Sequence, residues 1–146
     1  MSTAFATIAA TLLAALKATP ALAAGRVYTN PTRAIQDSFT PAIVLRLDAA
    51  EATEYPLGVH SWRTAFVVEC YARASSGQDP MTAVDTLLAD TWARLAALDA
   101  TTLGADLSLS PKIDWQYDAA DTPVVCAVIR LTAQHYTDTT TLAPRS

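Results

Sequence analysis

Hydrophobic and polar residues repeat along the chain with two different periods, which predicts both helices and strands. Residues 3–18 and 79–98 carry apolar residues at helical spacings of three to four. Asp79 precedes Pro80, and this order suits the start of a helix because the aspartate caps it and proline fits its first position. The two predicted stripes consist of Phe5, Ile8, Leu12 and Leu16, and of Val84, Leu87, Leu88, Trp92, Leu95 and Leu98.

Four other stretches alternate between apolar and polar residues, which is typical of a strand with one buried face. Pro111 interrupts the third stretch, so this strand is expected at a sheet edge or with a bulge. A further short strand is expected at residues 26–29. The four longer strands are expected at residues 42–48, 61–73, 107–117 and 123–136.

Three segments lack either period and are expected to connect or follow these elements. Residues 31–41 lie between two prolines and predict an irregular connection. Residues 49–60 are acidic and predict a long loop at the tip of a hairpin. Residues 137–146 are rich in threonine and predict a flexible C-terminal tail.

The order of the elements predicts one α+β domain over residues 1–146. It is helix, short strand, two long strands, helix and two long strands, with no repeated parallel crossover. We therefore expect a two-layer antiparallel β-sheet with two main helices packed on one face. Residues 5–16 imitate the apolar core of a secretory signal, but no positive residue precedes them and Lys17 follows, so an amphipathic helix is the better interpretation.

Composition narrows the kinds of partner that the chain can have. Apolar residues make up 51% of the chain and charged residues only 16%, against about 25% in typical soluble domains. Either alanine supplies the apolar excess, or a partner covers part of the surface. The net charge is −4 and the two lysines, Lys17 and Lys112, are far apart, which argues against nucleic-acid binding. No apolar run is long enough to span a membrane.

The residue types that usually carry chemistry are present without a recognisable arrangement. His60 and His135 have no metal-binding or catalytic spacing around them, and the four glycines form no phosphate-binding loop. Cys70 and Cys126 are interpreted as buried thiols, although a disulfide between strands stays open. We therefore expect no enzyme activity, cofactor or metal.

Two weaker patterns leave alternatives open. Asp114, Asp118 and Asp121 could bind a cation, but they lack the glycine and terminal glutamate of a calcium loop, and turn formation is simpler. The three tryptophans, Trp62, Trp92 and Trp115, all fall on apolar faces. Core packing is their simpler interpretation, and a ligand platform is the alternative.

Charged residues recur on the outward faces of the long strands, and most of them are arginines. Arginine is typical of interfaces because its planar fork forms oriented pairs with carboxylates. The face left uncovered by the helices is therefore either simply solvated or a subunit contact. The outward residues are Arg46, Arg63, Glu69, Arg73 and Arg130.

Three segments resemble the phage tail terminator family. They are residues 66–73 (FVVECYAR), the predicted helix from Met81 to Leu98, and residues 114–125 (DWQYDAADTPVV) before the last strand. The alanine- and leucine-rich first helix and the strand around Arg26-Val27-Tyr28 are similar too. The resemblance covers nearly the whole chain in element order.

The resemblance implies a virion structural protein at the head–tail junction, made in the host cytoplasm. Members form a ring, in this case expected to be a hexamer, that stops growth of the tail tube and joins the head connector. A ring needs two different contact patches on each subunit. We expect Glu51 and Glu54 on one patch and Arg46, Arg63, Arg73 and Arg130 on the other. The alternatives are a connector stopper or adaptor, and a small-molecule-binding α+β domain.

Overall fold

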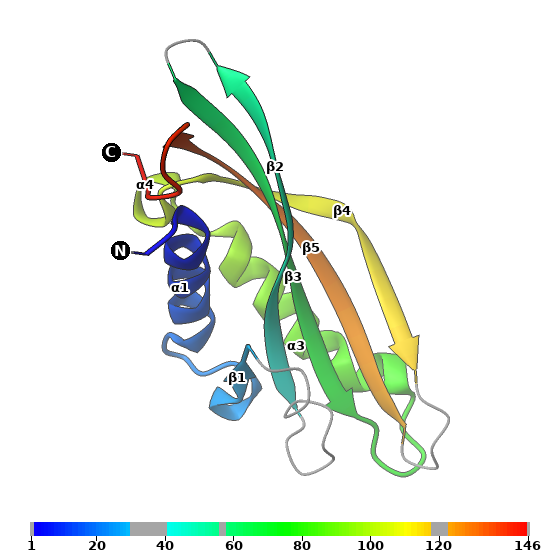
Figure 1. Ribbon diagram of the computed structural model, residues 1–146. Coiled ribbons are helices and arrows are strands. Elements are labelled where there is room, and N and C mark those ends of the chain that lie inside the picture. The colour runs from blue at the N-terminus through cyan, green and yellow to red at the C-terminus, as the bar shows by residue number, and fades with distance from the viewer. Residues whose placement is uncertain (1, 30–40, 56–57, 118–122, 146) are drawn as a thin grey trace.

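The protein folds as a single sheet with helices on one of its faces. A computed structural model describes residues 2–29, 41–55, 58–117 and 123–145. Within them, five strands form a sheet in the order β1-β2-β3-β5-β4 (Figure 1). The strands are β1 (Val27–Tyr28), β2 (Ala42–Tyr55), β3 (Val59–Arg73), β4 (Asp106–Tyr117) and β5 (Val124–Asp138). The helices are α1 (Ala4–Lys17), the 3-10 turn η1 (Ala23–Gly25), α3 (Pro80–Ala96) and α4 (Ala100–Leu103).

The two long helices begin at residues that satisfy their free amide groups. Thr3 caps α1, and its Oγ1 accepts a hydrogen bond from the Ala6 amide at 3.1 Å. Asp79 caps α3 by accepting from the Met81 amide at 2.9 Å, with Pro80 in the first helical position. Both predicted helices are thus confirmed to within two residues at each end.

Sequence periodicity missed the short helix α4. Asp99 caps it by accepting from the Thr101 amide at 3.1 Å. Gly104 ends it in the left-handed conformation, with φ of 73°, which glycine adopts without steric cost. A helix of one turn is too short to show an apolar period, so only these capping residues could have indicated it.

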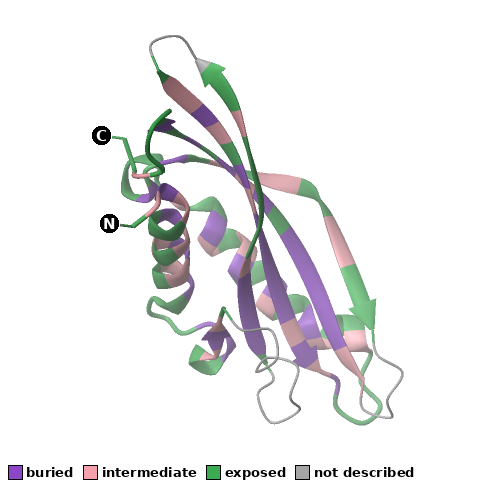
Figure 2. Ribbon diagram, viewed as in Figure 1, coloured by how far each residue is buried: buried purple, intermediate pink, exposed green. Residues whose placement is uncertain are grey.

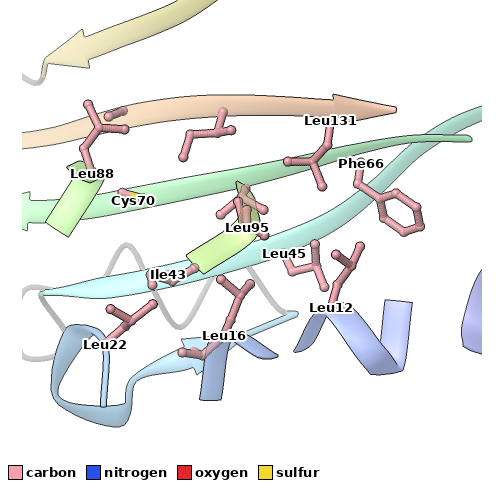
Figure 3. Packing of buried hydrophobic residues seen from close by; sticks show 14 of the residues in the cluster. Leu12, Leu16, Leu22, Ile43, Leu45, Phe66, Cys70, Leu88, Leu95 and Leu131 are labelled. Carbon is pink, nitrogen blue, oxygen red and sulfur yellow. The ribbon is translucent and has the colours of Figure 1, made fainter. Parts of the chain in front are cut away.

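The main core lies between the helices and one face of the sheet, and the α+β architecture predicted from the sequence is confirmed. Figure 3 shows apolar side chains from α1 and α3 meeting those of the strands. Leu12 and Leu16 are completely buried there, and truncation of such a leucine to alanine costs about 2–5 kcal/mol. The inward residues of β5 are those that its alternation predicted, namely Val125, Ala127, Ile129, Leu131 and Ala133.

The long loop predicted for residues 49–60 is wrong, because most of this segment is strand. β2 continues to Tyr55 and β3 begins at Val59. The register shifts between Leu47 and Ala49, so Asp48 sits in a bulge and the alternation changes phase there. Beyond the bulge most of the described β2 residues are exposed. Since neither face of this stretch is fully buried, no apolar period marks it.

The two edges of the sheet differ from each other. β1 runs parallel to β2, which makes the sheet mixed rather than wholly antiparallel, and it covers only Ile43 and Val44. β4 pairs with β5 on one side, and its register shifts between Leu109 and Ile113, around Pro111. The edge position and the bulge predicted from Pro111 are therefore confirmed. The connection predicted at residues 31–41 lies almost entirely outside the described residues.

The C-terminal segment contacts the start of α1. Thr137 and Asp138 still belong to β5, so the strand is longer than predicted. The Leu142 carbonyl accepts a hydrogen bond from the Ala4 amide at 2.6 Å. Arg145 pairs with Asp138 at 2.8 Å. The flexibility expected of this tail stays a prediction, and these contacts show where its described residues lie.

Candidate functional site

The sheet face that points away from the helices carries most of the residues expected at a subunit contact. Cross-strand register places Arg46, Val67 and Arg130 in one row across β2, β3 and β5. Glu51 and Arg63 are direct partners in another row of the same face, and Arg73 lies at the end of β3 opposite Val124.

Glu54 lies on the other side of the sheet. Its partner is His60, two residues before Trp62, and Trp62 lies on the helix side. Glu51 and Glu54 therefore do not form one acidic patch on a loop tip, because they are strand residues with side chains on opposite faces. The role of the six residues in subunit contact stays a prediction.

Two of the arginines are already paired with carboxylates of their own sheet. Arg46 Nε donates to Glu69 Oε1 at 2.9 Å, and Glu69 is only 8% exposed. The hydrogen bond and the charge of Glu69 raise the pKa of Arg46. Arg130 Nη1 donates to Asp114 Oδ2 on the edge strand β4. These pairs fix side chains across neighbouring strands, a role that outward alternation alone does not indicate.

Toward the C-terminal end of β3, beyond the charged pairs, the outer face is apolar and buried. Val67, Cys126 and Val128 form a small cluster with Tyr71. Figure 2 shows buried residues running along much of the central strands. Burial, followed by the charges of Cys126 and Glu69, raises the pKa of Tyr71. This half of the face is therefore a second layer of packing rather than a wet polar surface.

Toward the N-terminal half of β3, on the other side of the charged pairs, small side chains leave a hollow in the outer face. Ala49, Ala65 and Thr132 occupy one row, and Glu51 and Arg63 rise beside it. The hollow measures about 520 Å³. It is open to solvent and shallow, unlike the enclosed pockets that bury most of a small molecule.

A second group of polar and aromatic side chains lies on the helix side, under the start of α1. His135 Nε2 and Thr64 Oγ1 are 2.7 Å apart and both residues are buried. The ring of Phe5 meets those of Trp62 and His135 edge to face at 5.0 and 5.4 Å. Trp62 is thus half-buried and packs against Phe5 of α1, which agrees with the packing interpretation rather than with an open ligand platform.

Within the described ranges, the imidazole of His135 lacks an orienting hydrogen bond on its second nitrogen. His135 Nδ1 has no hydrogen-bond partner among the described residues, so the third group that orients the ring in a catalytic triad is missing from them. Burial lowers the pKa of His135, because the charged form is disfavoured away from water. The cavity beside it holds about 80 Å³ and is lined by α1, His135, Pro144 and Arg145.

The described residues hold no group of three or more histidine, cysteine, aspartate or glutamate side chains placed to bind a metal ion. Asp114, the described member of the predicted aspartate group, pairs with Arg130, while Asp118 and Asp121 lie outside the described residues. None of the helices in the described ranges combines the length and apolarity needed to cross a bilayer.

The sheet also settles the question of a cysteine pair. Cys70 and Cys126 are both free and buried. Cys70 faces the main core and is partnered by Ala127, whereas Cys126 faces the outer cluster and is partnered by Tyr71. Their side chains point to opposite faces, so a disulfide between them cannot form without reorganising the sheet.

Comparison with known proteins gives no further assignment. No family model matches the chain, and no curated protein matches it.

Sequence reasoning missed the exposed apolar side chains at the sheet edges. Trp115 and Tyr117 on β4 are 41% and 55% exposed, and Leu47 at the bulge of β2 is 52% exposed. The periodic pattern placed Trp115 in the core because it predicts the face of a strand, not the strand's position in the sheet. Pro111 indicated an edge strand, and combining that signal with the aromatic residues after it could have found them.

Proposed function

We propose that this chain is a virion structural protein, a tail terminator that forms a ring on the end of a phage tail tube. The proposal is carried by the resemblance of residues 66–73, 81–98 and 114–125 to tail terminators. The observed sheet with both long helices on one face agrees with the fold that this resemblance implies. In this role the ring ends tube growth and offers a joining surface to the head.

The distribution of polar groups supports an assembly role over a chemical one. Two carboxylates of the outer face, Glu69 and Asp114, pair with arginines of the same sheet. The imidazole with the shifted pKa lies buried under α1, beside a cavity much smaller than the roughly 300–1,000 Å³ of typical ligand sites. Within the described residues, the open strand edges and the exposed side chains of Trp115 and Tyr117 suit another chain better than a small molecule.

In this proposal the partners are other copies of the chain in a hexameric ring, the tail tube protein and the head connector. Electron microscopy of tails assembled without the protein tests it directly. Overlong tubes are the expected result. Tails of normal length that fail to join heads would instead favour a connector stopper or adaptor, and tails unchanged in both respects would overturn the proposal.

A small-molecule-binding role makes a different prediction. A ligand that binds only the folded state raises the melting temperature. A thermal-shift screen against common metabolites is therefore expected to show no stabilisation, and a concentration-dependent shift that is abolished by Trp62→Ala or His135→Ala would favour the binding role.

A further inference from the structure

Two stretches of the sheet edge have no strand beside them among the described residues. At the edge of the sheet formed by β2, β1 pairs only with Ile43 and Val44. The stretch from Leu45 to Tyr55 therefore has no strand paired with it on that edge among the described residues. At the opposite edge of the sheet, β4 pairs only with β5 among the described strands (Figure 1). Unpaired edges expose a row of amide and carbonyl groups that can accept another strand.

The two halves of β4 are protected to different degrees. The first half ends in a bulge that contains Pro111 and Lys112, and proline, lysine and bulges all discourage edge pairing. The second half, Ile113–Tyr117, has none of these devices. Its one charged residue, Asp114, is held by Arg130 on the neighbouring strand. This half of the edge is therefore open to pairing.

Exposed apolar side chains lie beside both open edges and on the same side of the sheet. Trp115 and Tyr117 are partnered by Ala127 and Val125, which face the helices. Leu47 on β2 is partnered by Phe66, which also faces the helices. If the sheet continues into another sheet with its helices on the same side, these side chains come to lie on one continuous face.

The strand directions favour a second copy of the chain as the occupant. β2 is antiparallel to β3, β3 to β5, and β5 to β4, so β4 runs antiparallel to β2. When copies repeat side by side with their helices on the same side, β4 of one copy meets β2 of the next in antiparallel orientation. We propose that Ile113–Tyr117 of β4 pairs with the part of β2 that follows the bulge at Asp48 in a neighbouring copy, so that the copies share a continuous sheet.

Charge and size select an offset register for this pairing. In a level alignment Asp106 would face Glu51, because both belong to the row that contains Arg63 and Gln134. An offset that places Trp115 opposite Ala52 and Tyr117 opposite Ala50 separates Asp106 from Glu51. Asp114 then lies diagonal to Glu51, but its charge is already paired with Arg130.

The same offset also matches large side chains to small ones. The aromatic rings then lie beside exposed or half-exposed alanines that leave room for them. A contact between two different edges is heterologous, and repetition closes a ring when the rotation between copies allows it. The inference thus rests on the proposed function and names the contact that would build its ring.

Cysteine cross-linking of the full-length chain tests the contact. Directly opposite residues in antiparallel strands have Cα atoms about 4.5–5.5 Å apart, within disulfide reach. The double variant Ala52→Cys/Trp115→Cys, mildly oxidised, is expected to give a ladder of linked oligomers on a non-reducing gel. Trp115→Cys alone is expected to give none, since dimers from it would mean a two-fold pairing of β4 with itself and would overturn the proposal.

The matched control pair is Met81→Cys/Leu142→Cys, whose positions are similarly exposed but lie off the two edges. No ladder from the edge pair, or an equal ladder from the control pair, would also overturn the inference. If the edge pair links while tails made without the protein keep their normal length, the edge contact stands and the terminator role fails.

Discussion

Arg46 Nε lies 2.9 Å from Glu69 Oε1, across the neighbouring strands β2 and β3. The side chain of Glu69 is 10% exposed, whereas that of Arg46 is 41% exposed. The arginine thus lies over the carboxylate and separates it from water. An arginine that the strand pattern suggests as a contact for another subunit also neutralises a buried charge in its own sheet.

Replacing Arg46 by leucine is expected to destabilise the fold, because the Glu69 carboxylate then stays buried without its partner. A buried charge left unpaired costs several kcal/mol, and solvent access at Arg46 reduces this to about 1–3 kcal/mol. Urea denaturation measures the free energy of unfolding. Glu69→Gln on the Arg46→Leu background is expected to recover part of the loss.

The control for that measurement is the exposed pair of Arg145 and Asp138, whose side chains are 45% and 55% exposed. Arg145→Leu is expected to change stability by less than about 1 kcal/mol, since exposed pairs contribute little. Equal losses for Arg46→Leu and Arg145→Leu would show that the Arg46 pair is not structural.

His135 makes the stability of the fold dependent on pH. Its folded-state pKa is lowered by burial, so the unfolded chain binds a proton at higher pH than the folded chain does. Stability is therefore unaffected by this residue above its unfolded pKa of about 6.5 and falls as the pH drops below it. Denaturation at about pH 7.5 and about pH 5 measures the loss.

The variant His135→Gln is expected to flatten that pH dependence, although it lowers stability at every pH by disturbing the contacts with Thr64 and Phe5. His60→Gln is the matched control, because His60 is only partly buried. A slope between the two pH values that survives in His135→Gln would mean that other groups cause it.

Arg94 is expected to hold the end of α1 in place. Its guanidinium donates to the carbonyls of Ala15, Ala18 and Pro20, at 3.4, 2.8 and 2.6 Å. Arg94→Met keeps the apolar stem but removes all three bonds, and about 1–3 kcal/mol of stability is expected to be lost.

Hydrogen exchange is expected to rise in residues 15–22 of Arg94→Met before it rises in the sheet. Asp85→Asn, an exposed change on the same helix, serves as the control. Unchanged exchange at the end of α1 would show that packing, rather than Arg94, holds this segment.

The sequence predicted the two long helices and the inward faces of β3 and β5, because each buries a regular stripe. It did not predict the second half of β2, since the bulge at Asp48 shifts the alternation and exposed strand residues are under no pressure to be apolar. The in-sheet pairs of Arg46 and Arg130 were not predictable either. The pairs join strands that follow one another in the chain, β2 with β3 and β4 with β5, but they depend on the cross-strand register, which the bulges at Asp48 and around Pro111 shift.

The thiols of Cys70 and Cys126 lie on opposite faces of the sheet. Burial raises the pKa of both Cys70 and Cys126 to about 12, and the thiolate is the reactive form. In the folded protein both are expected to react with a thiol reagent only as fast as the chain opens, and in urea both are expected to react at once.

Oxidation is expected to leave the intact mass of the monomer unchanged, because no intramolecular disulfide forms across the sheet. A loss of two hydrogens on oxidation under native conditions would contradict the placement of the two cysteines on opposite faces.

Cys126 is the thiol expected to react first with the reagent, since it belongs to the small outer cluster with Val67 and Val128, whereas Cys70 lies in the main core under α3. Mass spectrometry after partial labelling distinguishes the two sites, and earlier labelling of Cys70 would mean that the helices leave the sheet before the outer cluster opens.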